Sequence, residues 1–313
     1  MPGASRLCPP SDERSQTIYR VERVLGMSGR ILQAGLIGSG IQQSSSPSIH
    51  VEEGKALGLQ VCYELFDFDL IPGGAAQLGA LLDKVERSGF CGVNVTYPSK
   101  QAVIPLLHEL SPEARALHSV NTVLFKDGKR IGHNTDWWGF AQSFKRDMSD
   151  VLIDDIVLVG AGGAGAAVGY AMLKLGSKRL IIRDTDVSRA IALSSRLREL
   201  FVSRDIRVCH DLPTALANSH GLVHATPTGM RKHPGLPVPA DFLYPPLWIA
   251  EIVYVPLITP LLAIARLQGC RTLDGGGMAV YQAALAFKHF FQVEPNVPRM
   301  LRRFHARLAT AAA

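Results

Sequence analysis

Short apolar runs alternate with longer stretches of helical periodicity from residue 31 onwards. The first runs span residues 32–37, 61–66 and 91–95, and each precedes a helix-length segment. A second series follows in the rest of the chain, at residues 156–159, 179–182, 206–209, 222–225, 248–252 and 271–273. Strands that alternate with helices in this way are typical of parallel β-α units. The pattern therefore predicts an α/β protein with two α/β domains in sequence.

Composition and charge argue against several classes of protein. The chain has 313 residues, of which 47% are hydrophobic and 19% are charged, and its formal net charge is +6. The basic residues are scattered rather than clustered, so we expect no nucleic-acid partner. Glu251, Pro256 and Pro260 interrupt the longest apolar run, 247–265, which argues against a membrane span. The mild positive charge favours a small anionic ligand.

The five cysteines are widely spaced and never paired as C-x-x-C. They are typical of reduced thiols, and no signal-peptide-like run precedes residue 31, so we expect a cytoplasmic protein. No cluster of cysteines and histidines has the spacing of metal ligands, so we expect no metal site. Monomer and homodimer both stay open.

A glycine-rich loop directly follows the apolar run 156–159. The small residues that continue from it are compatible with a helix. This is the G-x-G-x-x-G pattern in its required context of strand, tight turn and helix, where the helix N-terminus offers free N–H groups to a pyrophosphate. The predicted dinucleotide-binding loop consists of Gly160, Ala161, Gly162, Gly163, Ala164 and Gly165.

An acidic residue after the next apolar run bears on which dinucleotide binds. Asp184 lies 24 residues after Gly160, close to the spacing at which a carboxylate meets the adenosine ribose hydroxyls. A carboxylate there repels a 2′-phosphate, so we expect NAD rather than NADP as the cofactor. Asp186 competes for this role or caps the following helix, and Arg183 is able to accept a phosphate.

Three polar clusters follow predicted strands of the first series, where open α/β sheets bind their ligands. They are residues 44–46, residues 94–100, and residues 121–122 together with 134–136. Each cluster has an ordinary alternative explanation, because serine, threonine and aspartate are common helix caps. Their accumulation at one edge of one domain suits an anion with several hydroxyl groups.

Lys100 belongs to the second of these clusters and is expected in the first turn of a helix. The helix dipole disfavours a cation there, which makes this lysine a candidate for chemistry rather than for stability. The alternative is a solvated surface lysine.

These features together set the expected domain boundaries. We expect residues 31–136, with about 277–313, to form a substrate-binding and catalytic domain to which the last helices return. Residues 137–276 are expected to form a Rossmann dinucleotide-binding domain that opens with a connecting helix over 136–155. Residues 1–30 are expected to be an extension without an assigned role.

The clusters and the glycine loop, in this order, resemble the shikimate/quinate dehydrogenase family, and the resemblance runs from Leu36 to Phe291. The matching stretches are residues 44–47 with His50, 92–96 with Pro98 and Lys100, 120–122, Gly132 with 134–136 and Gly139, the loop from Gly160, 225–230, 253–254 with Pro256 and Thr259, and Met278 with Gln282. The family implies a two-domain α/β fold. It also implies reversible oxidation of a ring hydroxyl of a small carboxylate by a nicotinamide cofactor.

The resemblance further implies roles for individual residues. Lys100 and Asp136 would be the catalytic pair beside the reacting hydroxyl. An aspartate favours protonated lysine, so which of the two takes the proton stays open. The substrate-binding residues would be Ser44 and Ser46, for the carboxylate, and Thr96, Asn121, Asp136 and Gln282, for the ring hydroxyls. The residues lining the nicotinamide end would be Thr226, Tyr254 and Gly275, with Met278 against the ring.

Several positions depart from the family's common pattern. His224 stands where many relatives have asparagine and Glu251 where aspartate is usual, and residues 118–119 and Ala279 also differ. Asp184 and the threonine after it replace the Asn-Arg pair of the NADP-using biosynthetic enzymes. This implies the NAD-preferring branch, which oxidises quinate, shikimate or both to the 3-dehydro ketone.

Three alternatives to this function differ in what they leave unexplained. An NADP-dependent biosynthetic shikimate dehydrogenase conflicts with the charge of Asp184. A sensor that binds the carbocycle without turnover conflicts with the presence of Lys100, Asp136 and the glycine loop. A dehydrogenase for an unrelated substrate, such as a folate, leaves the clusters at 44–46 and 134–136 without a purpose.

Overall fold

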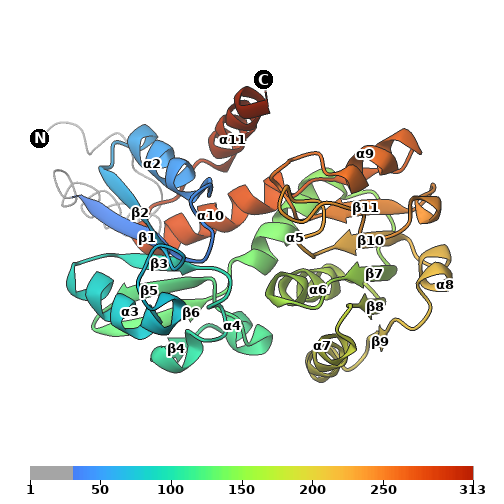
Figure 1. The fold of residues 1–313 in the computed structure, drawn as a ribbon, viewed down its shortest axis with the longest axis horizontal. Coiled ribbons are helices and arrows are strands. Elements are labelled where there is room, and N and C mark those ends of the chain that lie inside the picture. The colour runs from blue at the N-terminus through green and yellow to red at the C-terminus, as the bar shows by residue number, and fades with distance from the viewer. Residues whose placement is uncertain (1–30, 313) are drawn as a thin grey trace, which may run out of the picture.

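The two predicted series of strands form two separate six-stranded sheets in the computed structural model, which describes residues 31–312 (Figure 1). The first sheet has the order β2-β1-β3-β5-β6-β4. Its strands are β1 (Leu32–Gly38), β2 (Val61–Asp67), β3 (Gly92–Val95), β4 (Glu109–Leu110), β5 (Thr122–Lys126) and β6 (Lys129–His133). β1, β2 and β3 run parallel, whereas β5 is antiparallel to both β3 and β6.

Helices cover both faces of the first sheet. On one face, α3 (Leu78–Arg87) packs its leucines against Val93 and Val95. On the other face, α2 (Ser46–Ala56) lies against β2, and α10 (Gly276–Phe291) packs Phe287 and Phe290 against β1. The shorter elements of this half are η2 (Gly74–Gln77), η3 (Ile104–Leu106) and α4 (Pro112–Leu117).

The second sheet is parallel throughout and has the order β12-β11-β10-β7-β8-β9. Its strands are β7 (Asp155–Val159), β8 (Arg179–Arg183), β9 (Asp205–Val208), β10 (Gly221–His224), β11 (Trp248–Glu251) and β12 (Thr272–Leu273). In chain order this is the doubly wound arrangement of dinucleotide-binding domains, in which the ligand crevice lies where the strand order reverses. Here the reversal lies between β7 and β10, and the predicted α/β fold is confirmed.

Helices also cover both faces of the second sheet, which explains why its strands are almost continuously apolar. One face is covered by α5 (Asp136–Asp147), α6 (Gly163–Leu175) and α7 (Val187–Leu200). The other face is covered by α8 (Leu212–Ala217) and α9 (Pro260–Leu267), with the short η4 (Ala240–Phe242) beside them.

Two helices connect the sheets. α5 and α10 lie side by side between them (Figure 1). A Cβ added at Gly139 of α5 would lie 2.8 Å from the backbone of Met278 and of Gln282 in α10, so this close approach requires glycine. α10 then runs along the first sheet, so the C-terminal helices return to the first half of the chain, as predicted.

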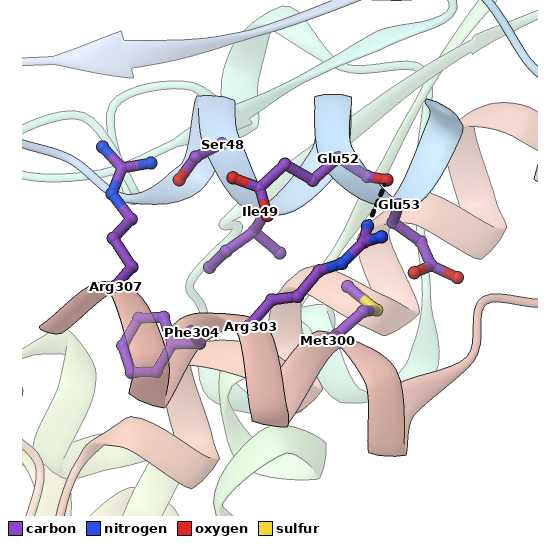
Figure 2. A pocket seen from close by; sticks show the side chains of 8 residues that line it. All are labelled: Ser48, Ile49, Glu52, Glu53, Met300, Arg303, Phe304 and Arg307. Carbon is purple, nitrogen blue, oxygen red and sulfur yellow. Dashed lines mark hydrogen bonds between the residues drawn. The ribbon is translucent and has the colours of Figure 1, made fainter. Parts of the chain in front are cut away.

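The last helix, α11 (Val297–Ala312), is held against α2 by arginines. Arg299 pairs with the buried carboxylate of Glu53 at 2.6 Å. Arg303 Nη1 donates to the backbone oxygen of Glu52 at 2.7 Å (Figure 2). The cleft between the two helices encloses about 10 Å³, which leaves room for about one water molecule. This seam is therefore packing rather than a ligand site.

Two predicted details of the fold differ from the structure. β5 and β6 form an antiparallel hairpin, whose turn places Asp127 and Gly128 at positive φ. An aspartate-glycine turn is typical of a two-residue hairpin, but the β-α rhythm predicted only parallel strands. The connecting helix ends at Asp147, well before residue 155.

Within residues 31–312, no helix is long and apolar enough to cross a membrane.

Candidate active site

The polar clusters of the first half converge at one edge of the first sheet. β1 and β3 end at this edge, and β5 begins there because it runs antiparallel to β3. β6, paired antiparallel with β5, ends at the same edge. Residues 94–96, 121–122 and 134–136 therefore meet although they lie far apart in the sequence.

Asn94 lies at the buried centre of this edge with both ends of its amide occupied. Its Nδ2 donates to the Asn121 backbone oxygen at 3.1 Å and to Thr122 Oγ1 at 2.9 Å. Its Oδ1 accepts from the Tyr63 hydroxyl at 2.8 Å, and burial raises the pKa of Tyr63, so this hydroxyl keeps its proton. Asn94 therefore holds neighbouring strands together.

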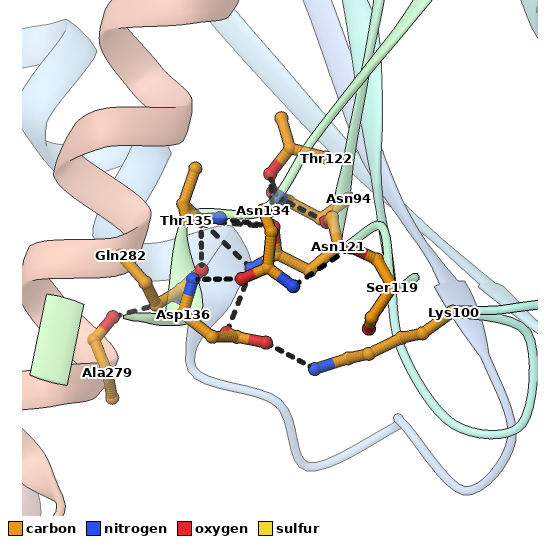
Figure 3. Close-up of polar contacts among 10 residues, drawn as sticks. All are labelled: Asn94, Lys100, Ser119, Asn121, Thr122, Asn134, Thr135, Asp136, Ala279 and Gln282. Atoms are coloured by element: carbon orange, nitrogen blue, oxygen red, sulfur yellow. Dashed lines mark hydrogen bonds and ion pairs between the residues drawn. The ribbon is translucent and has the colours of Figure 1, made fainter. Parts of the chain in front are cut away.

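Asn121 links the hairpin to the start of α5. Its Nδ2 donates to Thr135 Oγ1 at 2.9 Å and to Asp136 Oδ1 at 2.8 Å, while its Oδ1 accepts from the Thr135 backbone N–H at 2.7 Å. The Thr135 hydroxyl also reaches Gln282 Oε1 of α10 at 3.4 Å. One hydrogen-bond network thus contains Asn121, Asp136 and Gln282, three of the residues predicted to hold ring hydroxyls (Figure 3).

Lys100 and Asp136 form an ion pair at the border of this network. Lys100 Nζ lies 2.5 Å from Asp136 Oδ2, and the two side chains are 20% and 9% exposed (Figure 3). Asp136 is fixed from its other side as well, because Asn121 occupies Oδ1 and the Asp136 backbone N–H donates to Asn134 Oδ1 at 3.1 Å. An ammonium group carries three hydrogens, so Lys100 has donors beyond the one that Asp136 accepts.

Lys100 does not lie in the first turn of a helix, contrary to the prediction. It lies in a turn after β3, and the next helical residues are the short η3. Val103 N donates to Ser99 O at 3.0 Å and Val120 N donates to Lys100 O at 2.8 Å, which fixes the turn to the strand edge. The helix-dipole argument is therefore wrong, and the case for Lys100 rests on its contact with Asp136.

The serine cluster lies at the start of α2. Ser44 Oγ accepts from the Ser46 backbone N–H and donates to Ser46 Oγ, both at 3.2 Å, while Ser45, the N-cap residue, makes no side-chain capping bond. The ring of His50, one turn further along α2, contacts Ser46 O at 2.9 Å and stacks on Tyr63. Among the described residues, no hydrogen bond joins these serines or the half-buried Thr96 directly to Lys100 or Asp136.

The glycine loop lies at the reversal of strand order in the second sheet, between β7 and α6. Gly160 has φ of 110°, which favours glycine, and a Cβ added at Gly165 would lie only 1.9 Å from Gly160 O. A Cβ at Gly162 would meet no protein atom within 4 Å, so the backbone there is open to a ligand. The first N–H groups of α6 have no acceptor within the helix, and this cradle fits a dinucleotide pyrophosphate.

The two aspartates after β8 have different surroundings. Asp184 Oδ2 accepts from the Ala161 N–H of the glycine loop at 2.7 Å, and its Oδ1 accepts from the Asp186 N–H at 2.9 Å. Asp186 is the N-cap of α7 and accepts from the Ser188 N–H at 3.0 Å. Asp184 therefore lies beside the loop, and Asp186 has the capping position.

Two observations show that the edges of the two sheets lie close together. A Cβ added at Gly163, in the first turn of α6, would lie 3.7 Å from Lys100 Cδ and 3.6 Å from Ser119 Oγ. From the second sheet, Tyr254 lies close enough to Asp136 for the carboxylate to add to the rise in the Tyr254 pKa that burial causes. The ion pair thus faces the dinucleotide-binding half of the molecule.

The residues predicted for the nicotinamide end lie in three segments at the same edge of the second sheet. Thr226 follows β10, Tyr254 follows β11, and Gly275 and Met278 lie at the start of α10. A Cβ added at Gly275 would lie 2.3 Å from Ile252 O, so the second and third segments are in close contact. No group of three or more metal-ligating side chains occurs in residues 31–312.

Two polar residues beneath these segments had no predicted role. His224 and Glu251 end β10 and β11, are fully buried, and contact each other at 2.9 Å. The signal available in the sequence was a polar residue at the last position of each of two apolar strands. Their pairing was not visible there, because it depends on which strands are neighbours.

Comparisons with known proteins agree with this geometry. Residues 36–123 match the family described as "Shikimate dehydrogenase substrate binding domain". A protein named shikimate dehydrogenase (NADP(+)) from Streptomyces avermitilis is 49% identical over 280 residues, which cover 89% of this chain and 96% of that protein. A quinate/shikimate dehydrogenase (NAD(+)) from Corynebacterium efficiens is 42% identical over 276 residues, which cover 86% and 96%.

A similar solved structure covers both sheets. Quinate dehydrogenase from Corynebacterium glutamicum in complex with NAD matches with a TM-score of 0.83 and 39% identity, covering 88% of this chain and 99% of that one. Shikimate 5-dehydrogenase from Thermus thermophilus, in complex with NADP(H) and shikimate, matches with a TM-score of 0.78 and 31% identity, covering 88% and 99%. These similar proteins share a nicotinamide cofactor but differ in whether it is phosphorylated.

Proposed function

The chain belongs to the shikimate dehydrogenase family, and we propose that it oxidises a ring hydroxyl of quinate, of shikimate or of both to the 3-dehydro ketone, with NAD as hydride acceptor. The Lys100–Asp136 ion pair beside the glycine loop carries this proposal. It places a group able to exchange a proton next to the first turn of α6, where the dinucleotide pyrophosphate would be held.

The ion pair fits the proton half of the reaction. Oxidation of an alcohol needs a group that takes the hydroxyl proton while hydride leaves the same carbon. When bound, the nicotinamide supplies the acceptor for that hydride. The Lys100–Asp136 pair takes the proton and, in the reverse reaction, returns it. Asn121 contacts Asp136 Oδ1 and Lys100 contacts Oδ2, and we assign the reacting hydroxyl to the Lys100 side of the carboxylate.

The surrounding polar groups fit a hydroxylated carboxylate. Ser44 and Ser46 place two hydroxyls next to each other, and a carboxylate accepts several hydrogen bonds. We assign the substrate carboxylate to these serines and the ring hydroxyls to Thr96, Asn121, Asp136 and Gln282. Gln282 is held by its own Nε2, which donates to Ala279 O at 3.0 Å, so its Oε1 end is directed at the network around Thr135.

The position of Asp184 supports NAD. Its carboxylate lies beside Ala161 of the glycine loop, where the adenosine ribose of a dinucleotide is expected. An ionised carboxylate accepts hydrogen bonds from the ribose hydroxyls but repels a 2′-phosphate. The NAD complex of the similar quinate dehydrogenase agrees with this assignment.

An NADP-dependent biosynthetic shikimate dehydrogenase is the second candidate. The Streptomyces avermitilis protein, which is 49% identical, has a name that specifies NADP. The two candidates share the fold, the ion pair and the glycine loop, and they differ in the cofactor and in whether quinate is a substrate.

The proposal is tested by measuring the absorbance of the reduced cofactor as it forms. Quinate and shikimate are each paired with NAD and with NADP. Turnover of either acid with NAD is the expected result. Turnover of shikimate with NADP alone would establish the biosynthetic alternative. If all four reactions failed while either acid still bound, the chain would be a sensor of the carbocycle.

A further inference from the structure

His224 and Glu251 are register partners on neighbouring parallel strands. The Cα of His224 pairs with that of Glu251 in β11 and, on its other side, with that of Val159, which precedes the glycine loop. Register partners point to the same face of a sheet. Leu222 and Ile249, two residues earlier in each strand, belong to the apolar core under α8 and α9. The two polar side chains therefore replace apolar ones at the end of this core, directly below the dinucleotide crevice.

The Glu251 carboxylate is held by three donors from three different segments. His224 Nδ1 lies 2.9 Å from both carboxylate oxygens, the Val253 backbone N–H donates to Oε1 at 3.0 Å, and Thr259 Oγ1 donates to Oε2 at 3.2 Å. A buried carboxylate is stable only with such partners. Each donor is thereby fixed relative to the other two.

The second ring nitrogen of His224 extends this set to the loop after β10. His224 Nε2 forms a close hydrogen bond with Thr226 Oγ1, and the Thr228 backbone N–H donates to this Oγ1 at 3.2 Å. Further along, this loop packs against Thr259, one of the donors to Glu251: a Cβ added at Gly229 would lie 3.3 Å from Thr259 Cβ. His224, Thr226 and Thr259 thus belong to one closed ring of contacts around Glu251.

The same carboxylate also fixes the segments after β11 and before α10. Its bond to the Val253 N–H fixes the backbone directly before Tyr254. Gly275 packs directly on this segment, since its added Cβ would lie 2.6 Å from Val253 O. All three segments assigned to the nicotinamide end, at Thr226, Tyr254 and Gly275, are therefore connected to Glu251.

We propose that the buried His224–Glu251 pair is a positioning pair for the nicotinamide half of the cofactor. It aligns Thr226 and the backbone around Tyr254 and Gly275 without touching the dinucleotide itself. This inference rests on dinucleotide binding, which is part of the proposed function, but it does not depend on the identity of the oxidised acid.

Two substitutions of His224 separate the two contacts of its ring. In His224→Asn, the side-chain amide occupies the place of Nδ1, so the bond to Glu251 is kept and the bond to Thr226 is lost. In His224→Gln, the amide occupies the place of Nε2, so the bond to Thr226 is kept and the bond to Glu251 is lost. The two variants are matched in chemistry and differ in which partner they retain.

The measurement is the dissociation constant for NADH, for NADPH and for ADP-ribose, which lacks the nicotinamide. For His224→Asn we expect affinity for the preferred reduced dinucleotide to fall about tenfold, the scale of one lost hydrogen bond, with ADP-ribose changed less than about twofold. For His224→Gln we expect a lower melting temperature, because Glu251 loses a donor, and a loss of dinucleotide affinity smaller than that of His224→Asn, because the pair is broken while Thr226 keeps its partner.

Two outcomes would overturn the proposal. If His224→Asn binds the reduced dinucleotide as the wild type does, the pair positions nothing at that end. If it loses NADH and ADP-ribose equally, the pair only stabilises the domain. Should a His224 variant fail to fold, Thr226→Val removes the same hydrogen bond from its other partner, and unchanged dinucleotide affinity in that variant would again contradict the inference.

Failure of the proposed function gives a different result. A wild-type chain that binds NADH but oxidises neither quinate nor shikimate would contradict the proposed substrates, and the dissociation constants of the His224 variants would still decide the role of the pair.

Discussion

The substrate edge of the first sheet and the cofactor edge of the second sheet are built from different parts of the chain. At the substrate edge, side chains form the surface, and a hydrogen-bond network runs from Asn94 through Asn121 to Asp136 and Lys100. At the cofactor edge, the backbone forms the surface, because glycines have no side chains and leave the N–H groups of α6 exposed. The first edge should therefore respond to a change of chemical group, and the second to added volume.

Replacing Lys100 is the strongest test of the side-chain edge. Lys100→Ala should lower kcat by at least about a hundredfold, because it removes a positioned group for proton transfer. NADH affinity and melting temperature should change little, since the side chain lies at the border of the network rather than in the core. The measurement is the steady-state rate with quinate or shikimate, whichever the wild type oxidises.

Lys100→Arg is the matched control for this prediction. It keeps a cation beside Asp136, but a guanidinium does not release its proton at neutral pH. If charge alone matters, the arginine variant recovers turnover; if proton exchange matters, it stays as slow as the alanine variant. Near-normal turnover of Lys100→Ala would remove this residue from the mechanism and, with it, the contrast between the two edges.

Two alanine substitutions test the backbone edge by volume alone. Gly165→Ala should lower the free energy of unfolding by about 3 kcal/mol, because its Cβ would fall on Gly160 O and the helix must shift. Gly162→Ala adds the same methyl group where no protein atom lies within 4 Å, so its melting temperature should stay near that of the wild type.

Dinucleotide titration completes the glycine comparison. Although Gly162→Ala leaves the fold intact, the added Cβ takes the space through which a pyrophosphate approaches the backbone, so NADH affinity should fall. Unchanged NADH affinity in this variant would mean that the cofactor does not lie on the loop.

The two edges also differ in how far the sequence predicts them. The glycine loop is local: strand, turn and helix follow one another directly, and the motif predicts them together. The substrate edge is assembled from strands β3, β5 and β6, and the sequence indicated its polar residues but not the antiparallel hairpin that brings Asn121 next to Asp136. Periodicity alone does not contain that pairing.

Single residues show the same limit. Lys100 was expected on a helix because a helix-length segment follows the apolar run 91–95, whereas its turn is fixed by the N–H of Val120, which lies just before β5. His224 and Glu251 each appear as an isolated polar residue in the sequence, and only the order of the strands makes them partners. Contacts between neighbouring strands are therefore what sequence analysis failed to supply.

Acidification should lower the stability of the half of the molecule built around the first sheet. Burial lowers the pKa of His50 to about 4 and that of His289 to about 4, and it also lowers the pKa of His133; all three lie in the first sheet, α2 or α10. A histidine whose pKa is lower in the folded state is protonated first in the unfolded state. The contribution of such a histidine to the free energy of unfolding is therefore complete above the unfolded-state pKa. It is lost as the pH falls from about 6.5 towards 4.

For His50, which is completely buried, this loss amounts to about 2 kcal/mol at about pH 5. Unfolding by denaturant at neutral pH and at about pH 5 measures it. His50→Asn keeps a donor for Ser46 O but has no titrating ring, so its stability should depend less on pH across this range. An equal pH dependence in both proteins would assign the acid sensitivity to other groups.

The smallest expected effect concerns Asp184, an acidic side chain beside the glycine loop. Asp184 accepts from the Ala161 and Asp186 N–H groups, so an alanine substitution would remove two structural contacts along with the charge. Asp184→Asn keeps an oxygen acceptor and removes only the charge. The ratio of NAD to NADP efficiency should then shift towards NADP by about tenfold, because the repulsion of a 2′-phosphate disappears while the ribose hydroxyls keep a partner. If the ratio stays unchanged, the preference is set by groups other than Asp184, and the cofactor edge, like the glycines that form it, selects by shape rather than by charge.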